Sequence, residues 1–171
     1  WWVPGPDPAL AGASVAAATE AAAARLSAAV AARLARLGPE TALLVSGGLD
    51  SSLIAAFACE AAPGRRVAAV FSADAEGRPS PDEAEAQAAL FAALPGLDPV
   101  PAPAEARIRT PPVARAWWEV QGLPCNVPVA FRTLGLTAAA VRDGRGGVLA
   151  GVGGDCVISS PAEALTLEAL A

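Results

Sequence analysis

The chain has 171 residues, of which 54% are hydrophobic, and its formal net charge is −5. This length suits one domain with a real core, the apolar content argues against disorder, and the acidic balance argues against non-specific nucleic-acid binding. All twelve basic residues are arginine and the chain has no histidine, which excludes histidine triads, histidine-ligated metals and lysine Schiff bases. Any chemistry must use carboxylates, hydroxyls, arginines, thiols, backbone amides or an added metal.

The three cysteines, Cys59, Cys125 and Cys156, are odd in number and far apart. They give neither a disulfide framework nor a CxxC metal motif, so we predict free thiols in a reducing, cytoplasmic setting. Charged residues interrupt the long apolar runs, and no basic region precedes an apolar stretch near the N-terminus. The sequence indicates neither a membrane span nor a signal peptide.

The first half of the chain alternates helical and strand patterns. Apolar residues at helical spacing predict a helix from Ser14 to Leu37, which Gly38 and Pro39 end. Residues 41–46 form an apolar run too short for a helix and are predicted to be a buried strand. A helix is expected over 50–61, followed by a second buried strand over 67–73.

The same alternation continues in the second half. Ser80 is predicted to begin a helix reaching about Leu94, with a capping box to Glu83 and proline at the first helical position. The remaining predicted elements are a short, proline-interrupted strand over 98–102, helices over 112–121 and 127–143, a strand over 147–152 and a helix from 160. Strands alternating with helices predict an α/β fold, in which a parallel sheet carries helices on both faces.

Two clusters of glycine and aspartate fall at the predicted carboxyl ends of strands, VSGGLDSS at 45–52 and VLAGVGGDC at 148–156. Open parallel sheets bind ligands at such ends. Ser46-Gly47-Gly48 can turn tightly and present backbone N–H groups beside a helix N-terminus, which suits an anion. Asp50 would repel a phosphate unless Mg²⁺ bridged the two. In the alternative interpretation, Asp50 caps the helix and the glycines only turn the chain.

VSGGLDSS resembles the SGGxDSS signature of the N-type ATP pyrophosphatases, the PP-loop family, which hold the pyrophosphate released when ATP adenylates a substrate. VLAGVGGDC is similar to the SGxGxDE segment of asparagine synthetases, β-lactam synthetases and lasso-peptide cyclases. The similarity runs from about residue 1 to 158. It implies a Rossmann-like three-layer sandwich of the adenine nucleotide alpha-hydrolase type, forming one ATP-binding synthetase domain over 1–171.

The resemblance also implies roles for individual residues. The residues expected to form the pyrophosphate loop are Ser46, Gly47, Gly48, Asp50, Ser51 and Ser52. The residues that match positions lining AMP are Val45, Val70, Ala150 and Gly151. Asp50 and Asp155 would share Mg²⁺ and act as the catalytic pair. The second cluster departs from the family's segment at two positions. Cys156, directly after Asp155, replaces the family's glutamate, and Ala150 replaces the serine that opens the segment.

The family's catalytic lysine is expected beyond residue 171, so the domain is expected to be incomplete at its C-terminus, and no glutaminase domain is expected in the chain. Two acidic pairs, Asp74 with Glu76 and Asp82 with Glu83, could approach the ligand. A solvated loop explains the first pair, and the capping box explains the second.

The resemblance implies an ATP-dependent amide-forming synthetase that activates a carboxylate, aspartate by family analogy, as an acyl-adenylate. Its cofactors would be ATP and Mg²⁺. Its partners would be a small-molecule or peptide carboxylate, with a separate glutaminase domain or a precursor peptide, and neither nucleic acid nor membrane. The alternatives are a β-lactam or lasso-peptide type cyclase, an ATP-binding module without catalysis, and a structural α/β domain that binds no ATP.

Overall fold

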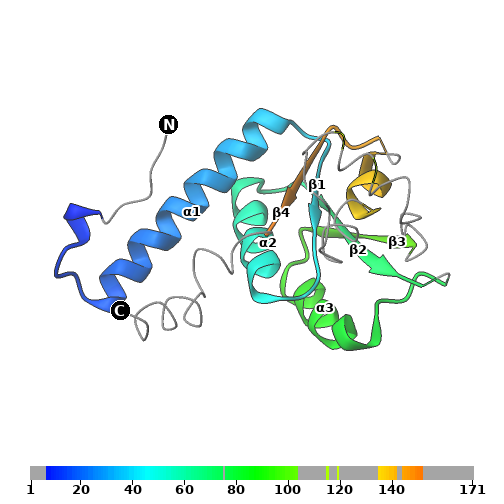
Figure 1. Ribbon diagram of the computed structural model, residues 1–171, viewed down its shortest axis with the longest axis horizontal. Helices are drawn as coiled ribbons and strands as arrows, with labels where there is room; N and C mark the ends of the chain where they lie inside the picture. The colour runs from blue at the N-terminus through cyan, green and yellow to red at the C-terminus, as the bar shows by residue number, and fades with distance from the viewer. Residues whose placement is uncertain are drawn as a thin grey trace.

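The computed structural model describes residues 7–74, 76–103, 115, 119, 135–141 and 144–151. Its elements are, in chain order, η1 (Pro8–Leu10), α1 (Val15–Leu37), β1 (Thr41–Leu44), α2 (Leu49–Ala61), β2 (Val67–Ala73), α3 (Pro81–Ala93), β3 (Leu97–Pro103) and β4 (Gly147–Ala150). Residues 135–141 are also helical. Figure 1 shows the strands side by side between helices that approach from both sides.

The four strands form one parallel sheet in the order β3-β2-β1-β4. β1 is central, and its Leu43 lies opposite Ala69 of β2 on one side and Leu149 of β4 on the other. The chain moves outward from β1 through β2 to β3 and then crosses back to add β4 beside β1. The direction of strand addition therefore reverses between β1 and β4, which makes that boundary a topological switch point.

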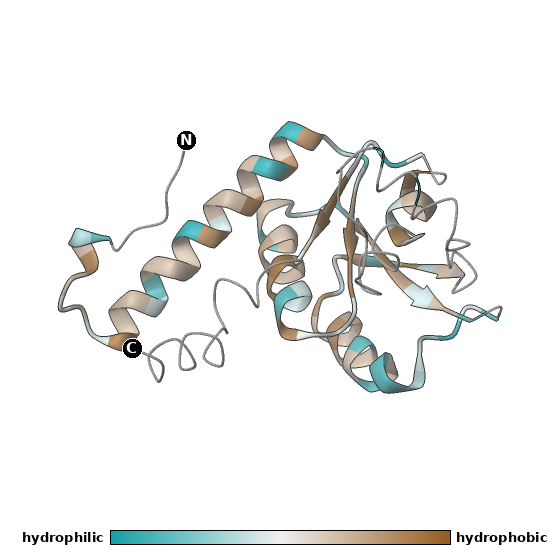
Figure 2. Ribbon diagram, in the orientation of Figure 1, coloured by the Kyte–Doolittle hydropathy of each residue, from teal (hydrophilic) through white to brown (hydrophobic). Residues whose placement is uncertain are grey.

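Alternate residues of the strands pack into two separate layers. On one face, odd-numbered strand residues such as Leu43 and Phe71 form a cluster with Val30 of α1, Ala55 of α2 and Leu90 of α3. On the other face, even-numbered residues contact Leu136 and Ala140 of the helical segment 135–141. In Figure 2 the central strand β1 and its neighbour β4 are mostly brown, because their residues are mainly apolar, whereas the proline-containing β3 is paler. The predicted α/β fold with helices on both faces is confirmed.

Local sequence explains where the helices begin and end. α1 begins after Ser14, whose side chain accepts a hydrogen bond from the N–H of Ala17, and ends at Gly38, which has a positive φ of 82°. α3 begins at Pro81, as expected, but the predicted capping box is wrong. The Ser80 hydroxyl does not cap the helix; it lies 3.4 Å from Oδ1 of Asp82, and the carbonyl of Ser80 accepts the N–H of Glu83.

β3 lies at one edge of the sheet in the part of the chain that the structure describes, and it contains proline at every second position, Pro99, Pro101 and Pro103. Gly96 directs its carbonyl at Val67 of β2, so residues 98, 100 and 102 share that direction and the three prolines face the open edge. A proline that faces outward removes no ladder hydrogen bond, which is why an edge strand tolerates this sequence. The predicted strand over 98–102 is thus confirmed and longer than expected.

The other predicted elements are confirmed with small shifts in their ends. β1 and β4 are shorter than their predicted ranges of 41–46 and 147–152, and α2 begins one residue before Asp50. Of the predicted helices over 112–121 and 127–143, residues 115, 119 and 135–141 are helical. The rest of these two ranges lies outside the described residues, as does the predicted helix from 160.

By length and composition, α1 meets the criteria for a membrane-spanning helix, and few of its residues are buried inside the protein. Its apolar character comes mainly from alanine, and Arg25, Arg33 and Arg36 interrupt it. α1 contributes Val30 to the core and packs along α2 (Figure 1). It thus forms part of the layer that covers the sheet.

Candidate functional site

The first glycine–aspartate cluster lies at the switch point, where β1 passes into α2. Val45 follows β1 and continues its pairing, because its N–H donates to the carbonyl of Val70 at 2.9 Å. Gly47 then adopts a φ of +81°, in the left-handed region that favours glycine. The chain thus turns within three residues from a buried strand into a helix whose first turn faces the carboxyl edge of the sheet.

Two serine hydroxyls hold this turn together. Ser51 Oγ accepts the N–H of Ser46 at 3.3 Å and donates to the carbonyl of Gly48 at 3.1 Å. Ser46 Oγ accepts the N–H of Gly48 at 3.3 Å and lies 3.2 Å from Ser51 Oγ. The two hydroxyls therefore fix the shape of the loop, a structural task that accompanies their predicted role as donors to pyrophosphate.

The first turn of α2 offers unused backbone donors. Gly48 is the N-cap and supplies no side-chain hydrogen bond, and the N–H of Ser52 is the first to find a helical acceptor, the carbonyl of Gly48 at 3.0 Å. Within the described part of the chain, the N–H groups of Leu49, Asp50 and Ser51 have no acceptor. These donors and the positive end of the helix dipole together suit an anion.

Asp50 is the second residue of α2 and is half-buried. Because Gly48 occupies the N-cap position, the alternative in which Asp50 caps the helix is wrong. Its carboxylate makes no hydrogen bond or ion pair with any described residue. A carboxylate with spare oxygens beside free backbone donors is a suitable ligand for Mg²⁺ carrying a phosphate chain.

The second cluster begins where β4 meets this same turn. Ala150 pairs with Leu44 at the end of the sheet, and Gly151 follows it. A Cβ built on Gly151 would lie 2.9 Å from the carbonyl carbon of Asp50 and 2.9 Å from the nitrogen of Ser51. Only glycine permits this approach, which places the start of the second cluster directly against the first turn of α2.

Asp155 lies four residues beyond Gly151, outside the described residues, so its convergence with Asp50 on one metal ion stays a prediction. The structure does bring together the backbone segments that would carry the pair. Among the side chains that it describes, no group of three cysteines or carboxylates is arranged to hold a metal. Asp50 is thus the one predicted metal ligand whose position is known.

The two valines predicted to line AMP are deeply buried, with Val45 2% and Val70 1% exposed. Val45 belongs to the apolar cluster on one face of the sheet, and Val70 belongs to the cluster on the other face. Val45 directly follows β1, and its N–H donates to the carbonyl of Val70 in the middle of β2, so the two backbones lie side by side where the loop begins. Their predicted contact with the nucleotide remains a prediction.

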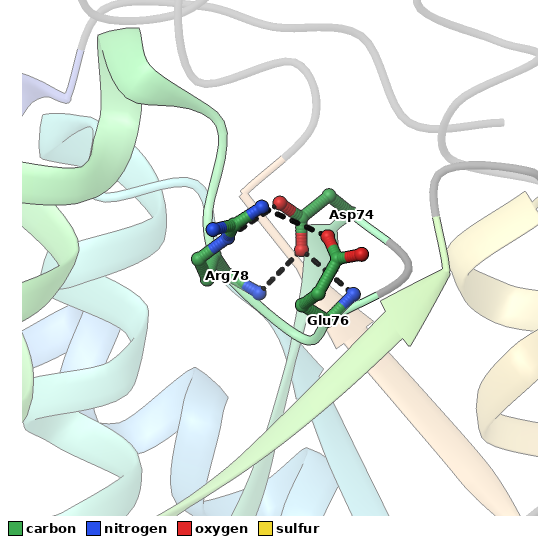
Figure 3. Close-up of polar contacts among 3 residues, drawn as sticks. All are labelled: Asp74, Glu76 and Arg78. Carbon is green, nitrogen blue, oxygen red and sulfur yellow. Dashed lines mark hydrogen bonds and ion pairs between the residues drawn. The ribbon is translucent and has the colours of Figure 1, made fainter.

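Asp74, Glu76 and Arg78 form a closed group in the loop after β2 (Figure 3). Oδ1 of Asp74 accepts the backbone N–H groups of Glu76 and Arg78, and its Oδ2 accepts Nε of Arg78 at 2.8 Å. Nη2 of Arg78 donates to Glu76 at 2.8 Å. The backbone and side-chain hydrogen bonds from Arg78 lower the pKa of Asp74. These exposed side chains satisfy one another, in agreement with the solvated-loop interpretation.

The support that α3 gives to the loop could not be read from the sequence. A Cβ built on Gly47 would lie 2.9 Å from Cβ of Ala86 and 3.0 Å from the nitrogen of Gln87. Gln87 itself is completely buried. Gln87 lies three residues before Leu90, on the inner face of α3. The sequence contains no pattern that would predict a contact between this face and the loop at Gly47.

Gly47→Ala should lower the free energy of unfolding by about 1–3 kcal/mol, because the new methyl group meets α3 and the backbone must hold a left-handed conformation. Chemical denaturation measures the change. Gly48→Ala is the matched control, since Gly48 has an ordinary φ of −69° and a Cβ built on it meets only the Ser46 hydroxyl, at 3.3 Å. Equal stability of the two variants would show that α3 does not restrict Gly47.

Comparison with known proteins identifies the family of this chain. The family model described as asparagine synthase matches residues 21–160, a range that contains both glycine–aspartate clusters. A comparison with curated proteins gives no match. Since the matched range covers most of the chain, the protein belongs to the asparagine synthase family.

Proposed function

We propose that the protein is a ligase of the asparagine synthase type that forms an amide by way of an acyl-adenylate. Membership of the family indicates an ATP-dependent amide-forming synthase in general terms. The carboxylic acid that is activated would, by family analogy, be aspartate, and the incoming nucleophile would be ammonia or an amine. A carboxylate oxygen of the substrate would attack the α-phosphorus of ATP, pyrophosphate would leave, and the amine would then displace AMP.

One observation carries this proposal: at the switch point of the sheet, the first turn of α2 presents the N–H groups of three successive residues, 49–51, beside the carboxylate of Asp50, and none of these groups has a partner among the described residues. Such donors suit the charge that develops on departing pyrophosphate. The residues that would hold the β- and γ-phosphates are Ser46, Gly47, Gly48, Ser51 and Ser52. Asp50, with Asp155, would hold Mg²⁺, which neutralises charge on the leaving group when bound.

The position of Gly151 supports a shared site for the two clusters. Its contact with the backbone of Asp50 and Ser51 places residue 151, four positions before Asp155 in the sequence, at the edge of the loop. Val45, Val70, Ala150 and Gly151 would border the AMP part of the nucleotide. The half-buried backbone of Ala150 and Gly151 at the end of β4 is consistent with that role.

The reaction is tested by measuring pyrophosphate release from Mg-ATP in the presence of candidate acids, with aspartate and ammonium as the first pair. We expect pyrophosphate and AMP to form in equal amounts and only when the acid is present, together with the amide. Omission of the acid or of Mg²⁺ provides the controls. Formation of ADP and phosphate, or no substrate-dependent pyrophosphate from any acid tested, would contradict the proposal.

A second candidate is a cyclase of the β-lactam or lasso-peptide type, because these families share the SGxGxDE segment that the second cluster resembles. Ala150 and Cys156, within that cluster, depart from the segment before and after Asp155. In that reaction an amine of the same substrate attacks the acyl-adenylate, so ammonium is not consumed. A catalytically silent ATP-binding module would instead bind Mg-ATP and release no pyrophosphate.

We further propose that the protein acts in the cytoplasm, with a separate glutaminase or a precursor peptide as its partner.

A further inference from the structure

The side chain of Gln87 is completely buried, with a relative exposure of 0%. Its Nε2 donates to Oε2 of Glu83, one helical turn earlier, at 3.1 Å. Its Oε1 has no hydrogen-bond partner among the residues that the structure describes. A buried amide oxygen without a donor destabilises a protein, and an apolar side chain of similar size would fill the same space without that cost. The glutamine therefore calls for an explanation beyond packing.

Gln87 lies at the point where α3 supports the loop. The backbone nitrogen of Gln87 and the Cβ of Ala86 form the surface against which Gly47 packs, with no room for even a methyl group between them. The N–H of Gly47 has no acceptor among the residues that the structure describes. An unused buried acceptor and an unused loop donor thus occur on two segments in direct contact.

We propose that Gln87 is a positioning residue for the pyrophosphate loop: its Oε1 accepts a backbone N–H of the loop, that of Gly47, when a phosphate chain is bound. This inference rests on the proposed function of the loop. The hydrogen bond to Glu83 orients the amide, because it assigns Nε2 to the carboxylate and leaves Oε1 for the loop. The ligand-free protein keeps the unpaired oxygen, and ligand binding satisfies it.

The proposal predicts that stability and affinity respond differently to Gln87→Leu. The ligand-free variant should melt at the same temperature as the wild type or above it, because an unsatisfied polar atom is removed. Its affinity for magnesium pyrophosphate should fall about fivefold, the effect of one ordinary hydrogen bond. Its affinity for adenosine should not change. Thermal unfolding and calorimetric titration with pyrophosphate and with adenosine measure these quantities in the full chain.

Glu85→Leu is the matched control, because Glu85 lies on the exposed face of the same helix. This variant should bind pyrophosphate as the wild type does. An unchanged affinity of Gln87→Leu for pyrophosphate, with the wild type binding normally, would overturn the positioning role and leave the proposed function intact. A wild type that binds neither Mg-ATP nor pyrophosphate would overturn both.

If Gln87→Leu is poorly folded, a second pair of variants tests the positioning role of Gln87. Glu83→Gln keeps an oxygen that can accept Nε2 of Gln87, whereas Glu83→Leu does not, and both remove the same negative charge. The leucine variant should bind pyrophosphate more weakly than the glutamine variant by a few-fold. Equal affinities of the two variants would overturn the proposal, since the orientation of the Gln87 amide would then have no effect on the loop.

Discussion

Asp50→Asn should reduce substrate-dependent pyrophosphate release by about two orders of magnitude or more, the usual effect of removing one group that stabilises developing charge. The substitution removes the charge with which the loop would hold Mg²⁺, and it leaves the size of the side chain unchanged. It should also abolish the rise in melting temperature that Mg-ATP gives the wild type, because stabilisation by a ligand falls as its dissociation constant rises. Pyrophosphate release and thermal unfolding with Mg-ATP measure the two effects.

The fold should tolerate this change, since the Asp50 carboxylate makes no hydrogen bond or ion pair with any residue described. Asp82→Asn provides the control. Asp82 is the second residue of α3, as Asp50 is of α2, so both variants lose the same favourable interaction with a helix dipole, about 0.3–1 kcal/mol. If Asp50→Asn and Asp82→Asn retained the same activity and the same response to Mg-ATP, Asp50 would be no metal ligand.

Gly151→Ala should lower the free energy of unfolding by about 1–3 kcal/mol, because the added methyl group would overlap backbone atoms that cannot rotate away. The atoms concerned are the carbonyl carbon of Asp50 and the nitrogen of Ser51, each 2.9 Å from the new carbon. Relief requires β4 or the first turn of α2 to move. Either shift displaces the free N–H groups, so Mg-ATP should stabilise this variant less than it stabilises the wild type.

Gly146→Ala is the matched control for this second experiment. Gly146 lies just before β4, a Cβ built on it meets nothing within 4 Å, and its φ lies outside the left-handed region. The control should keep both its stability and its response to Mg-ATP. Wild-type behaviour of Gly151→Ala would mean that the second cluster does not rest on the loop, and the shared-site proposal would lose its structural support.

The sequence was sufficient for elements whose patterns are local. The second strand was predicted at Val67–Ala73 and is found there, because an apolar run bounded by Pro63-Gly64 and by a polar loop leaves few alternatives. The position of the loop between a strand and a helix also followed from the glycines of VSGGLDSS. These features depend on short stretches of chain that fold in nearly the same way in many surroundings.

Features that depend on contacts between distant segments could not be predicted in the same way. Which strand lies beside β1, and hence where the switch point falls, is set by long-range pairing. The packing of Gly47 on α3 and of Gly151 on α2 was likewise invisible, although glycine at both positions was noted. The capping box was wrong because Ser80 has a competing local partner, Asp82, two residues away.

The prolines of β3 have a consequence for how this protein behaves in concentrated solution. The three outward-facing prolines carry no amide hydrogen, and the N–H of Leu97 already donates to Leu94, so an incoming chain would find carbonyl acceptors there and too few donors to extend the sheet. Exposed strand edges are common starting points for aggregation, and proline is one of the devices that protect them. β3 is therefore a poor template for intermolecular assembly, which leaves the protein's apolar, alanine-rich chain less prone to aggregate through this side of the sheet.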